Sequence, residues 1–393
     1  MPQIKAFAGI RNDVTAERFS EGDLEIANNV DIDNTGKLLL REGYAKKING
    51  AYHSLWSAGD ICLFVTGAQL RRLSSDLTTS TLIRNDLTPN LRMEYHFTND
   101  NVYYSNGKQT GIYNNSGNRT WGIVPPSYQP IAQQDFGDLP AGRYQFALTY
   151  VRGDNQESGT GIADAINITT GAIRFTDIAV SSDPAVTHKI IYISTHNGEV
   201  LYRAIVLDNT TTSALYNGAD LRTPLDTQFM QNAPAGQIIG SFAGYMYVAY
   251  DKWLHYSDAF GFELFDLRRY LPFDSVITLF APMIDGVFVG TQKAIYFMQG
   301  RDPDAMKLDK RADYGVIANT LCYVPATSIA GLDAQPDEVA IIFTAQNGIC
   351  YGVNNGILVN MTQQRYAYDK SSAGAALFKN NNNANQYIAV LRT

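Results

Sequence analysis

Five stretches of the chain share one pattern: a turn residue, a short strand of alternating apolar residues, a small polar turn and a second alternating strand. The copies are GDICLFVTGAQLRRLSSD from Gly59, NDNVYYSNGKQTGIYNN from Asn99, AGYMYVAYDKWLHYSDA from Ala243, IDGVFVGTQKAIYFMQG from Ile284 and DEVAIIFTAQNGICYGV from Asp337. This pattern predicts a β-hairpin in each copy. Copies begin 40 (59 to 99), 41 (243 to 284) and 53 residues (284 to 337) apart, near the roughly 40–50 residues of a propeller blade. We therefore expect an all-β protein built on a β-propeller of five or six blades.

The interval between the second and third copies is too long for one blade, so an insertion is expected there. A stiff Pro125–Pro126 pair precedes AGRYQFALTYVRGDNQESGTG, DAINITTGAIRFTDI and HKIIYISTHNGEVLYRAIVLDNTTTS. Evenly spaced strands with Gly and Asn turns are typical of an immunoglobulin or fibronectin-like sandwich. The predicted division is an N-terminal arm with a ring-closing hairpin (1–50), first blades (51–128), an inserted immunoglobulin-like sandwich (138–234) and remaining blades (235–393).

A sixth, shorter copy of the pattern, NANQYIAVLRT, begins near Asn383. An incomplete blade needs a strand from elsewhere, because an open sheet edge invites unwanted pairing. The N-terminal run KLLLREGYAKKI, residues 37–48, is the expected partner that closes the ring.

Composition favours strands and excludes several functions. The chain is 45% hydrophobic and 18% charged, with 24 Tyr and 18 Phe, residues that suit pleated, half-buried surfaces. The net charge is −7 with no basic block, so sequence-specific nucleic-acid binding is not expected. Cys62, Cys322 and Cys350 are widely spaced in apolar contexts and predict reduced core residues. No signal peptide or membrane span is apparent, which predicts a soluble protein made in the cytoplasm without membrane insertion.

The phrases NNVDIDNTGKLLLREGY, AGRYQFALTYVRGDNQESG, THKIIYIST and YMYVAYDKWLHYSDAFGFELFD, with the order of parts, resemble the tail nozzle or tail-hub proteins of short-tailed bacteriophages, also called packaged-DNA stabilisation proteins. The resemblance implies a virion protein of the phage tail, assembled as a homo-oligomer, a hexameric ring. It also implies head-to-tail adaptor or connector proteins as partners, tail fibres or a needle as further partners, and double-stranded DNA passing through without sequence specificity. The alternative is a glycan-binding or glycan-cleaving propeller that recognises a receptor.

No catalytic residues, metal or cofactor are expected from the sequence, and an enzyme is not predicted. The five histidines (His53, His96, His188, His196 and His255) have no metal-ligand spacing. The segment NNSGNRTW, residues 114–121, is a broken copy of the sialidase turn. DPDAMKLDKRAD, residues 302–313, mixes acids with bases and fits a solvated loop.

One aromatic-rich stretch, AYDKWLHYSDAFGFELFDLRRYLPF, is a candidate protein interface. Exposed aromatic rings beside arginines are typical anchors of such surfaces. The candidates are Trp253, Tyr256, Phe260, Phe262, Arg268 and Arg269. The alternative is that these rings pack between blades.

The segment DIDNTGKLLLRE, residues 31–42, has the oxygen-ligand spacing of a calcium loop through Asp31, Asp33, Thr35 and Glu42. Leu39 at the ninth position and a strand-like run after Gly36 argue against calcium. We expect a hairpin with Asn34, Thr35 and Gly36 as its turn, serving as the ring-closing element.

Overall fold

The computed structural model describes residues 6–33, 35–41, 43, 45–46, 48–363, 365–366, 368, 371–381 and 384–392. These residues form 33 strands and three single-turn 3-10 helices, η1 (Ala16–Arg18), η2 (Ala326–Ser328) and η3 (Asn354–Gly356). The described part of the chain contains no α-helix. The all-β prediction is therefore confirmed.

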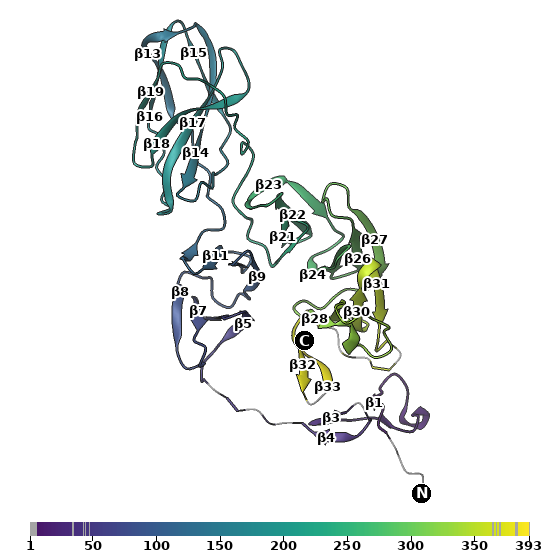
Figure 1. Cartoon of the computed structure of the whole chain (residues 1–393). Coiled ribbons are helices and arrows are strands. Elements are labelled where there is room, and N and C mark those ends of the chain that lie inside the picture. Colours follow the sequence, from purple (N-terminus) through teal and green to yellow (C-terminus); the bar gives the residue numbers. More distant parts are fainter. Residues whose placement is uncertain are drawn as a thin grey trace.

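Outside the inserted unit, twenty of the strands form five four-stranded antiparallel sheets, which we number in chain order (Figure 1). The first sheet holds β5 (His53–Ala58), β6 (Ile61–Thr66), β7 (Gln69–Leu73) and β8 (Ser80–Arg84). The second holds β9 (Glu94–Thr98), β10 (Asn101–Ser105), β11 (Thr110–Asn114) and β12 (Gly117–Arg119). The third holds β20 (Ile238–Phe242), β21 (Tyr245–Tyr250), β22 (Trp253–Asp258) and β23 (Gly261–Pro272). The fourth holds β24 (Ile277–Pro282), β25 (Gly286–Thr291), β26 (Ile295–Gln299) and β27 (Lys307–Ala312). The fifth holds β28 (Cys322–Pro325), β29 (Val339–Ala345), β30 (Gly348–Val353) and β31 (Ile357–Asn360).

The five hairpins predicted from the repeated pattern are confirmed, and each forms the middle pair of one sheet. They are β6–β7, β10–β11, β21–β22, β25–β26 and β29–β30. Strand β25 of the fourth sheet is buried along its whole length, on both faces. Val287 and Val289 pack toward the third sheet, whereas Phe288, one position along, packs toward the fifth. Alternate side chains of a strand point to opposite faces, so one strand supplies two cores.

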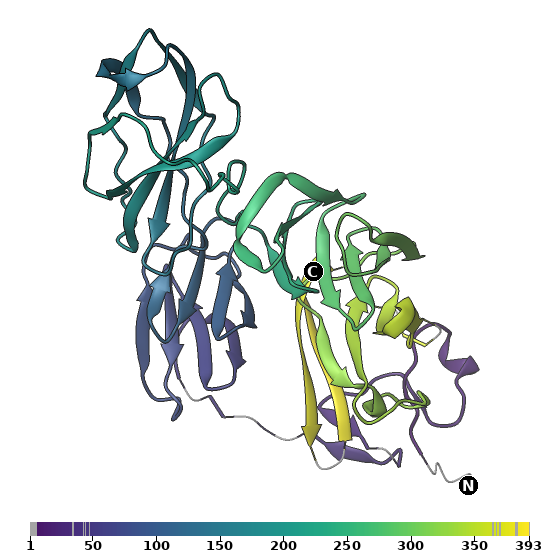
Figure 2. The same cartoon turned by 45° about the horizontal axis from the view of Figure 1, so that its top comes forward.

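The sheets follow one another like the layers of a stack, with one hydrophobic cluster between each neighbouring pair. A final hairpin, β32 (Ala373–Asn381) and β33 (Ala384–Arg392), adds a sixth layer through a fifth cluster that includes Phe378 and Tyr387. The stack curves, because successive first strands contact each other: β5 with β9, β9 with β20 and β20 with β24. These first strands line a shared axis, as Figure 2 shows from a second side.

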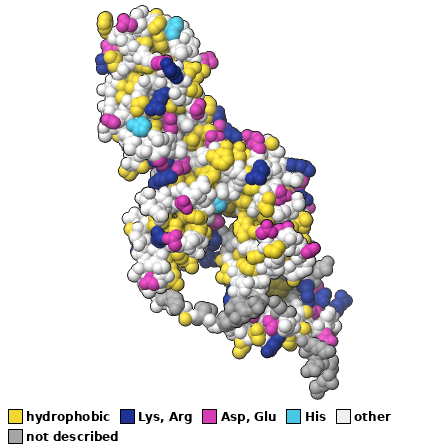
Figure 3. Space-filling view, viewed as in Figure 1, with side chains coloured by type: hydrophobic (Ala, Val, Ile, Leu, Met, Phe, Trp, Pro, Cys, Tyr) yellow, Lys and Arg dark blue, Asp and Glu magenta, His cyan; other side chains and the backbone are white. Residues whose placement is uncertain are grey.

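The curved stack remains open. Figures 1 and 2 place the first sheet and the β32–β33 hairpin on opposite sides of a gap, and Figure 3 shows an opening between the first two sheets and the later ones. Within the described residues, β33 pairs only with β32. The prediction that the N-terminal run completes this last layer is therefore wrong there. Its strand β4 (Leu38–Leu40) pairs with β3 (Val30–Ile32) instead.

The N-terminal arm is fastened to the far end of the stack. Its strand β1 (Gly9–Ile10) pairs in parallel with β2 (Asp23–Leu24). The Asn12 backbone N–H donates to the Arg365 carbonyl oxygen at 3.0 Å, and the Arg365 guanidinium donates to the Asp23 carboxylate at 2.5 Å. Asp23 and Arg365 are 342 positions apart, so this contact joins the start of the chain to the loop after β31.

The inserted unit has two sheets around one core. One holds β13 (Ile131–Leu139), β16 (Gly171–Thr176) and β19 (Ala214–Tyr216), and the other holds β15 (Asp164–Ile168), β14 (Gly142–Arg152), β17 (Val186–Ser194) and β18 (Leu201–Asp208). Phe146 and Phe175 meet edge to face across this core at 5.1 Å between ring centroids. The unit begins before the predicted boundary at 138, because β13 starts at Ile131. It projects from the stack (Figure 1).

Candidate functional site

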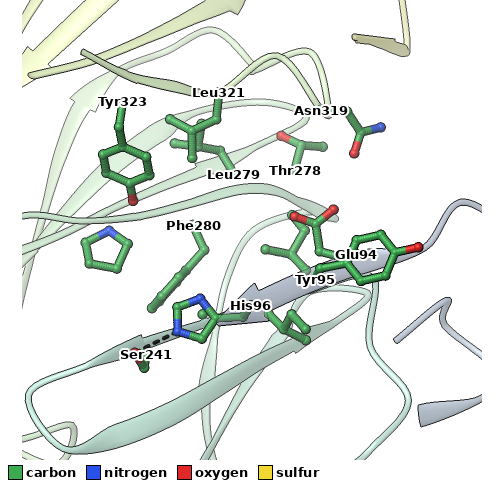
Figure 4. A pocket seen from close by; sticks show the side chains of 14 residues that line it. Glu94, Tyr95, His96, Ser241, Thr278, Leu279, Phe280, Asn319, Leu321 and Tyr323 are labelled. Atoms are coloured by element: carbon green, nitrogen blue, oxygen red, sulfur yellow. Dashed lines mark hydrogen bonds between the residues drawn. The ribbon is translucent and has the colours of Figure 1, made fainter. Parts of the chain in front are cut away.

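A pocket of about 420 Å³ lies on the axis where the first strands of sheets two to four meet the start of the fifth. Figure 4 shows its labelled side chains. Glu94, Tyr95 and His96 come from β9, Ser241 from β20, Thr278, Leu279 and Phe280 from β24, and Asn319, Leu321 and Tyr323 from β28 and the segment before it. The pocket exists because four consecutive sheets converge with their first strands innermost. Sequence reasoning missed it, since its residues are spread over more than half of the chain.

Burial shifts the pKa of the four titratable side chains recorded in the axial pocket, Glu94, Tyr95, His96 and Tyr323, and it raises the pKa of both tyrosines. Burial raises the pKa of Glu94 to about 7, although Arg92, 3.8 Å away, opposes the shift. Burial also lowers the pKa of His96 to about 4. At neutral pH the imidazole is therefore uncharged and the carboxyl is a mixture of both forms.

The pair of His96 and Ser241 is the nearest approach to a catalytic constellation in this pocket. His96 Nε2 and Ser241 Oγ share a hydrogen bond of 2.8 Å, drawn as a dashed line in Figure 4. An activated serine needs a base whose pKa lies near the working pH, held in place by a third group. The pKa of His96 is far below neutrality, and no carboxylate is recorded as a partner of its ring among the described residues. This geometry does not support acyl transfer.

The predicted interface residues fall into two groups. Tyr256 is 3% exposed and belongs to the core between the third and fourth sheets, so it cannot present its ring to a partner; that candidate is corrected. Phe262 packs against Tyr103 at 6.3 Å between ring centroids, and Trp253 packs edge to face on Tyr270 at 4.7 Å. The alternative of packing within the stack therefore holds for Tyr256 and, in part, for these two rings.

Phe260 and Arg268 are the candidates that reach the surface. The Phe260 ring is 84% exposed and lies over Gly244 in the turn before β21. Arg268 forms a salt bridge with Asp266 at 2.7 Å and places its guanidinium 4.0 Å from the centre of the Phe229 ring. Arg269 is paired with Asp304 at 2.8 Å and stacks over Tyr256. Phe229 was missed, because it precedes the aromatic-rich stretch and joins it only in the fold.

The predicted hairpin at residues 31–42 forms, but its acidic residues are already occupied. Asp33 Oδ1 accepts hydrogen bonds from Thr35 N, Thr35 Oγ1 and Lys37 N at 2.8, 2.6 and 2.9 Å, and Asp31 pairs with Arg41 at 2.9 Å. Gly36 has a φ of +81°, and a Cβ there would stand 2.5 Å from the Ala6 Cβ. Asn34 and Glu42 lie outside the described residues. No group of three or more potential metal ligands occurs among the residues that are described.

A buried cluster of charges joins the inserted unit to the stack. The Glu263 carboxylate on β23 receives hydrogen bonds from Arg152 at the end of β14, from Arg119 at 2.6 Å, and from the Gly122 backbone N–H at 3.2 Å. Arg152 is 1% exposed and Glu263 is 8% exposed. The sequence carries no local signal for this cluster, since Arg119 and Glu263 are 144 positions apart.

Backbone contacts reinforce this junction. The Ala233 N–H donates to the Trp121 carbonyl oxygen at 3.0 Å, and Trp121 Nε1 donates to the Phe262 carbonyl oxygen at 2.7 Å. Gly122 has a φ of +85°, and a Cβ there would stand 2.5 Å from the Glu263 carbonyl oxygen. The chain therefore enters and leaves the inserted unit at adjacent, tightly packed positions.

No protein-family model matches this chain, and no curated protein matches it. Among solved structures, the chain is similar to the BBS1 N-terminal part in a complex with ARL6 (TM-score 0.33, 11% identity, covering 87% of this chain and 90% of that one). It is also similar to a chain of a nidogen–laminin complex (TM-score 0.22, 9% identity, covering 78% of this chain and 95% of that one). A third similar structure is Sqt1 of Saccharomyces cerevisiae (TM-score 0.19, 10% identity, covering 72% of this chain and 90% of that one). TM-scores this low support no statement about fold or function. Separately, no helix among the described residues is long and apolar enough to cross a membrane.

Proposed function

We propose that the chain is a structural component of a bacteriophage tail, a subunit of the nozzle or hub ring at the end of the DNA-ejection channel that helps to retain packaged DNA. In this proposal the five sheets are blades of a β-propeller, and the inserted unit is an immunoglobulin-like sandwich. The subunits form a homo-oligomeric ring, a hexamer, in the virion.

The observation that carries the proposal is the order of parts around one axis. Two four-stranded sheets are followed by the inserted two-sheet unit and then by three more four-stranded sheets. This is the order that the sequence resemblance implies: arm, first blades, inserted sandwich and remaining blades. The resemblance rests on short sequence segments, whereas the order of the sheets rests on strand pairing, so the two are different properties of the chain.

The chemistry of the described surface is consistent with a mechanical role. The axial pocket contains one carboxylate, Glu94, whereas glycoside cleavage requires a facing pair. A net charge of −7 disfavours tight binding of phosphate and suits a wall past which DNA slides. The buried Arg152–Glu263 contact anchors the inserted unit to the stack, and the two parts would offer separate surfaces for neighbours, adaptors or fibres.

A ring of identical subunits needs a heterologous interface, in which two different patches meet and close after a fixed number of copies. Phe260 and Arg268 are the exposed aromatic and cationic candidates for one of these patches. Residues of this kind are enriched at the energetic centres of interfaces.

Mass photometry and negative-stain microscopy of the purified chain, with and without phage portal and adaptor proteins, test the proposal. We expect rings that bind the adaptor complex. A stable monomer that ignores these partners and binds or hydrolyses oligosaccharides would instead establish the glycan-recognition alternative.

A further inference from the structure

The outer face of the first sheet is apolar and hollow. Leu55, Cys62, Phe64 and Leu73 alternate with the side chains that pack toward the second sheet, and they line a cavity of about 720 Å³. Leu55 is 71% exposed, and Leu77 at the rim is 46% exposed. Each of the second to fifth sheets has a hydrophobic cluster on both sides, whereas no such cluster of described residues lies on this face. The Tyr52 ring alone is recorded there as a ring contact, edge to face on Phe64 at 5.3 Å between centroids, and Phe64 is 7% exposed.

One arginine lines this cavity, and its own sheet satisfies it. Arg71 donates to Ser80 Oγ at 2.9 Å, to Gln69 Oε1 at 2.8 Å and to the Ser80 carbonyl oxygen at 3.0 Å. The face therefore needs no acidic partner. It fits an apolar surface of similar width, such as two paired strands.

The last layer of the stack has a matching free surface. In the β32–β33 hairpin, Phe378 and Tyr387 face the fifth sheet, and the Tyr387 hydroxyl donates to the Thr320 carbonyl oxygen at 2.6 Å. On the opposite face, the cross-strand pairs Ala375–Val390 and Leu377–Ile388 form an apolar patch, flanked by the pairs Lys379–Gln386 and Ala373–Arg392. Leu377 is 52% exposed and Val390 is 67% exposed.

Strands that are apolar on both faces are typical of positions covered on both sides. Strand β6 of the first sheet and the middle of the last hairpin have this pattern, yet each has a hydrophobic cluster on one side only in the described structure. They are the two ends of the same curved stack (Figures 1 and 2). One contact between them would give all six layers a partner on each face.

We propose that the outer face of the first sheet is the docking site for the outer face of the β32–β33 hairpin of the same chain. The contact places Leu377 and Val390 against Leu55 and Leu77, and it closes the stack into a ring of six layers. The sixth layer is thus covered by the first sheet and not completed by the N-terminal strand.

Chain connectivity favours the same molecule over a second copy. The first sheet follows β4 after residues 41–52, a segment of about a dozen residues that reaches at most about 40 Å. The arm before it is fastened to the loop after β31 through Asp23 and Arg365. Both ends of the stack are therefore tethered to each other, and such tethers produce effective concentrations in the millimolar range.

Cys62 on the docking face provides a natural probe. In a Cys322→Ser, Cys350→Ser background, Leu377→Cys adds one thiol on the outer face of the hairpin, and Val390→Cys is an independent second variant. Treatment with bis(maleimido)ethane should join Cys62 to the new thiol within one chain, detected as a linked peptide pair in the monomer band. Leu215→Cys, on a strand of the inserted unit with a similar exposure of 49%, is the control and should not link to Cys62.

The yield of the link within one chain should be independent of protein concentration. Links found only in dimers, rising with concentration, would assign the face to a second copy and overturn the proposal. Absence of any link in both variants, with circular dichroism showing that they are folded, would overturn it as well.

Alkylation of Cys62 gives a second measurement that needs no cross-link. Leu377→Asp should speed the reaction of Cys62 at least tenfold if the hairpin covers it, and an unchanged rate would contradict the proposal. Closure of the stack involves one chain, whereas the tail ring involves several. The cross-linking and alkylation results therefore test closure independently of the proposed ring assembly.

Discussion

Arg152, at the end of β14 in the inserted unit, and Glu263, on β23 of the third sheet, form a buried ion pair between segments 111 positions apart. Arg119 and the Gly122 backbone N–H converge on the same Glu263 oxygen. The Glu263 carboxylate thus pairs with the buried Arg152 side chain and with the Arg119 side chain, which is 24% exposed.

Glu263→Gln should destabilise the protein by about 3 kcal/mol, because it leaves two arginine side chains at the junction without their counter-charge. Urea unfolding measures the loss of stability, and small-angle scattering should show that the inserted unit has become mobile relative to the stack. Asp220→Asn, which breaks the exposed pair with Arg222, is the control and should cost less than about 0.5 kcal/mol. Equal effects of both substitutions would contradict the role assigned to Glu263.

The arm should detach from the stack in acid. Hydrogen bonds from the Ser20 backbone N–H, Arg11 and Arg365 lower the pKa of Asp23 below its usual value of 3.8. A lowered pKa stabilises the folded state fully above pH 3.8, and this contribution is lost as the pH falls through the lowered value. The protection of residues 6–24 against hydrogen exchange, taken relative to the intrinsic rate at each pH, should therefore persist at pH 5 and fall below about pH 4.

Asp23→Asn should reproduce this acid behaviour at neutral pH, since the neutral amide cannot pair with both arginines. Asp13→Asn removes the partly exposed partner of Arg11 and should leave the exchange of the arm nearly unchanged. Slow exchange of the arm in Asp23→Asn would mean that other contacts hold it.

Glu94→Gln should stabilise the protein at alkaline pH. The carboxyl has a pKa of about 7 in the folded chain, raised by burial from 4.5, so its ionisation between those values favours unfolding. The advantage of the glutamine should grow from near zero at pH 4.5 to about 1–2 kcal/mol at pH 8, below the full linkage value because the side chain is 30% exposed. Thermal melts between pH 4.5 and pH 8 measure the stability difference between Glu94→Gln and the unmodified protein, with the exposed Glu199→Gln as control. A stability difference that does not change with pH would refute the burial of the Glu94 charge.

Calcium should leave the melting temperature unchanged. Asp33 already accepts three hydrogen bonds within its own turn, and Asp31 is paired with Arg41. A ligand that binds only the folded state raises the melting temperature in proportion to RT ln(1 + [L]/Kd). A rise of several degrees in millimolar calcium, reversed by a chelator, would show that these carboxylates bind the ion.

Phe260→Ala should weaken self-association while changing stability by less than about 0.5 kcal/mol, because the ring is 84% exposed. Phe136→Ala, a ring 96% exposed on β13, is the matched control and should affect neither. Sedimentation equilibrium compares the two variants. If Phe260→Ala self-associates as strongly as the unmodified protein, Phe260 is not part of the interface.

The parts of the fold that could be predicted are those encoded locally. Alternation around short turns located all five central hairpins, because side-chain period and turn chemistry act over about a dozen residues. The inward burial of Tyr256 could not be predicted, since β22 has aromatic residues on both faces and only the position of the fourth sheet decides which face is covered. The partner of the N-terminal strand was also wrong, because several apolar strands compete for each edge and the sequence does not rank distant pairings.

The functional candidates show the same division. The acidic turn at Asp33 was recognised as a hairpin because its donors are its own neighbours. The Glu263 cluster and the axial pocket were missed because their members come from separate sheets, brought together only by the curvature of the stack.

The hydrogen bond between Trp121 and Ala233 has a consequence for how such chains diversify. It joins the two positions where the chain leaves and rejoins the stack, so the whole inserted unit occupies the place of a tight loop between the second and third sheets. Any folded unit whose termini lie close together could be exchanged at this point without altering the order of the layers. The junction at Trp121 is therefore a position where one inserted domain could replace another while the stacked sheets stay the same.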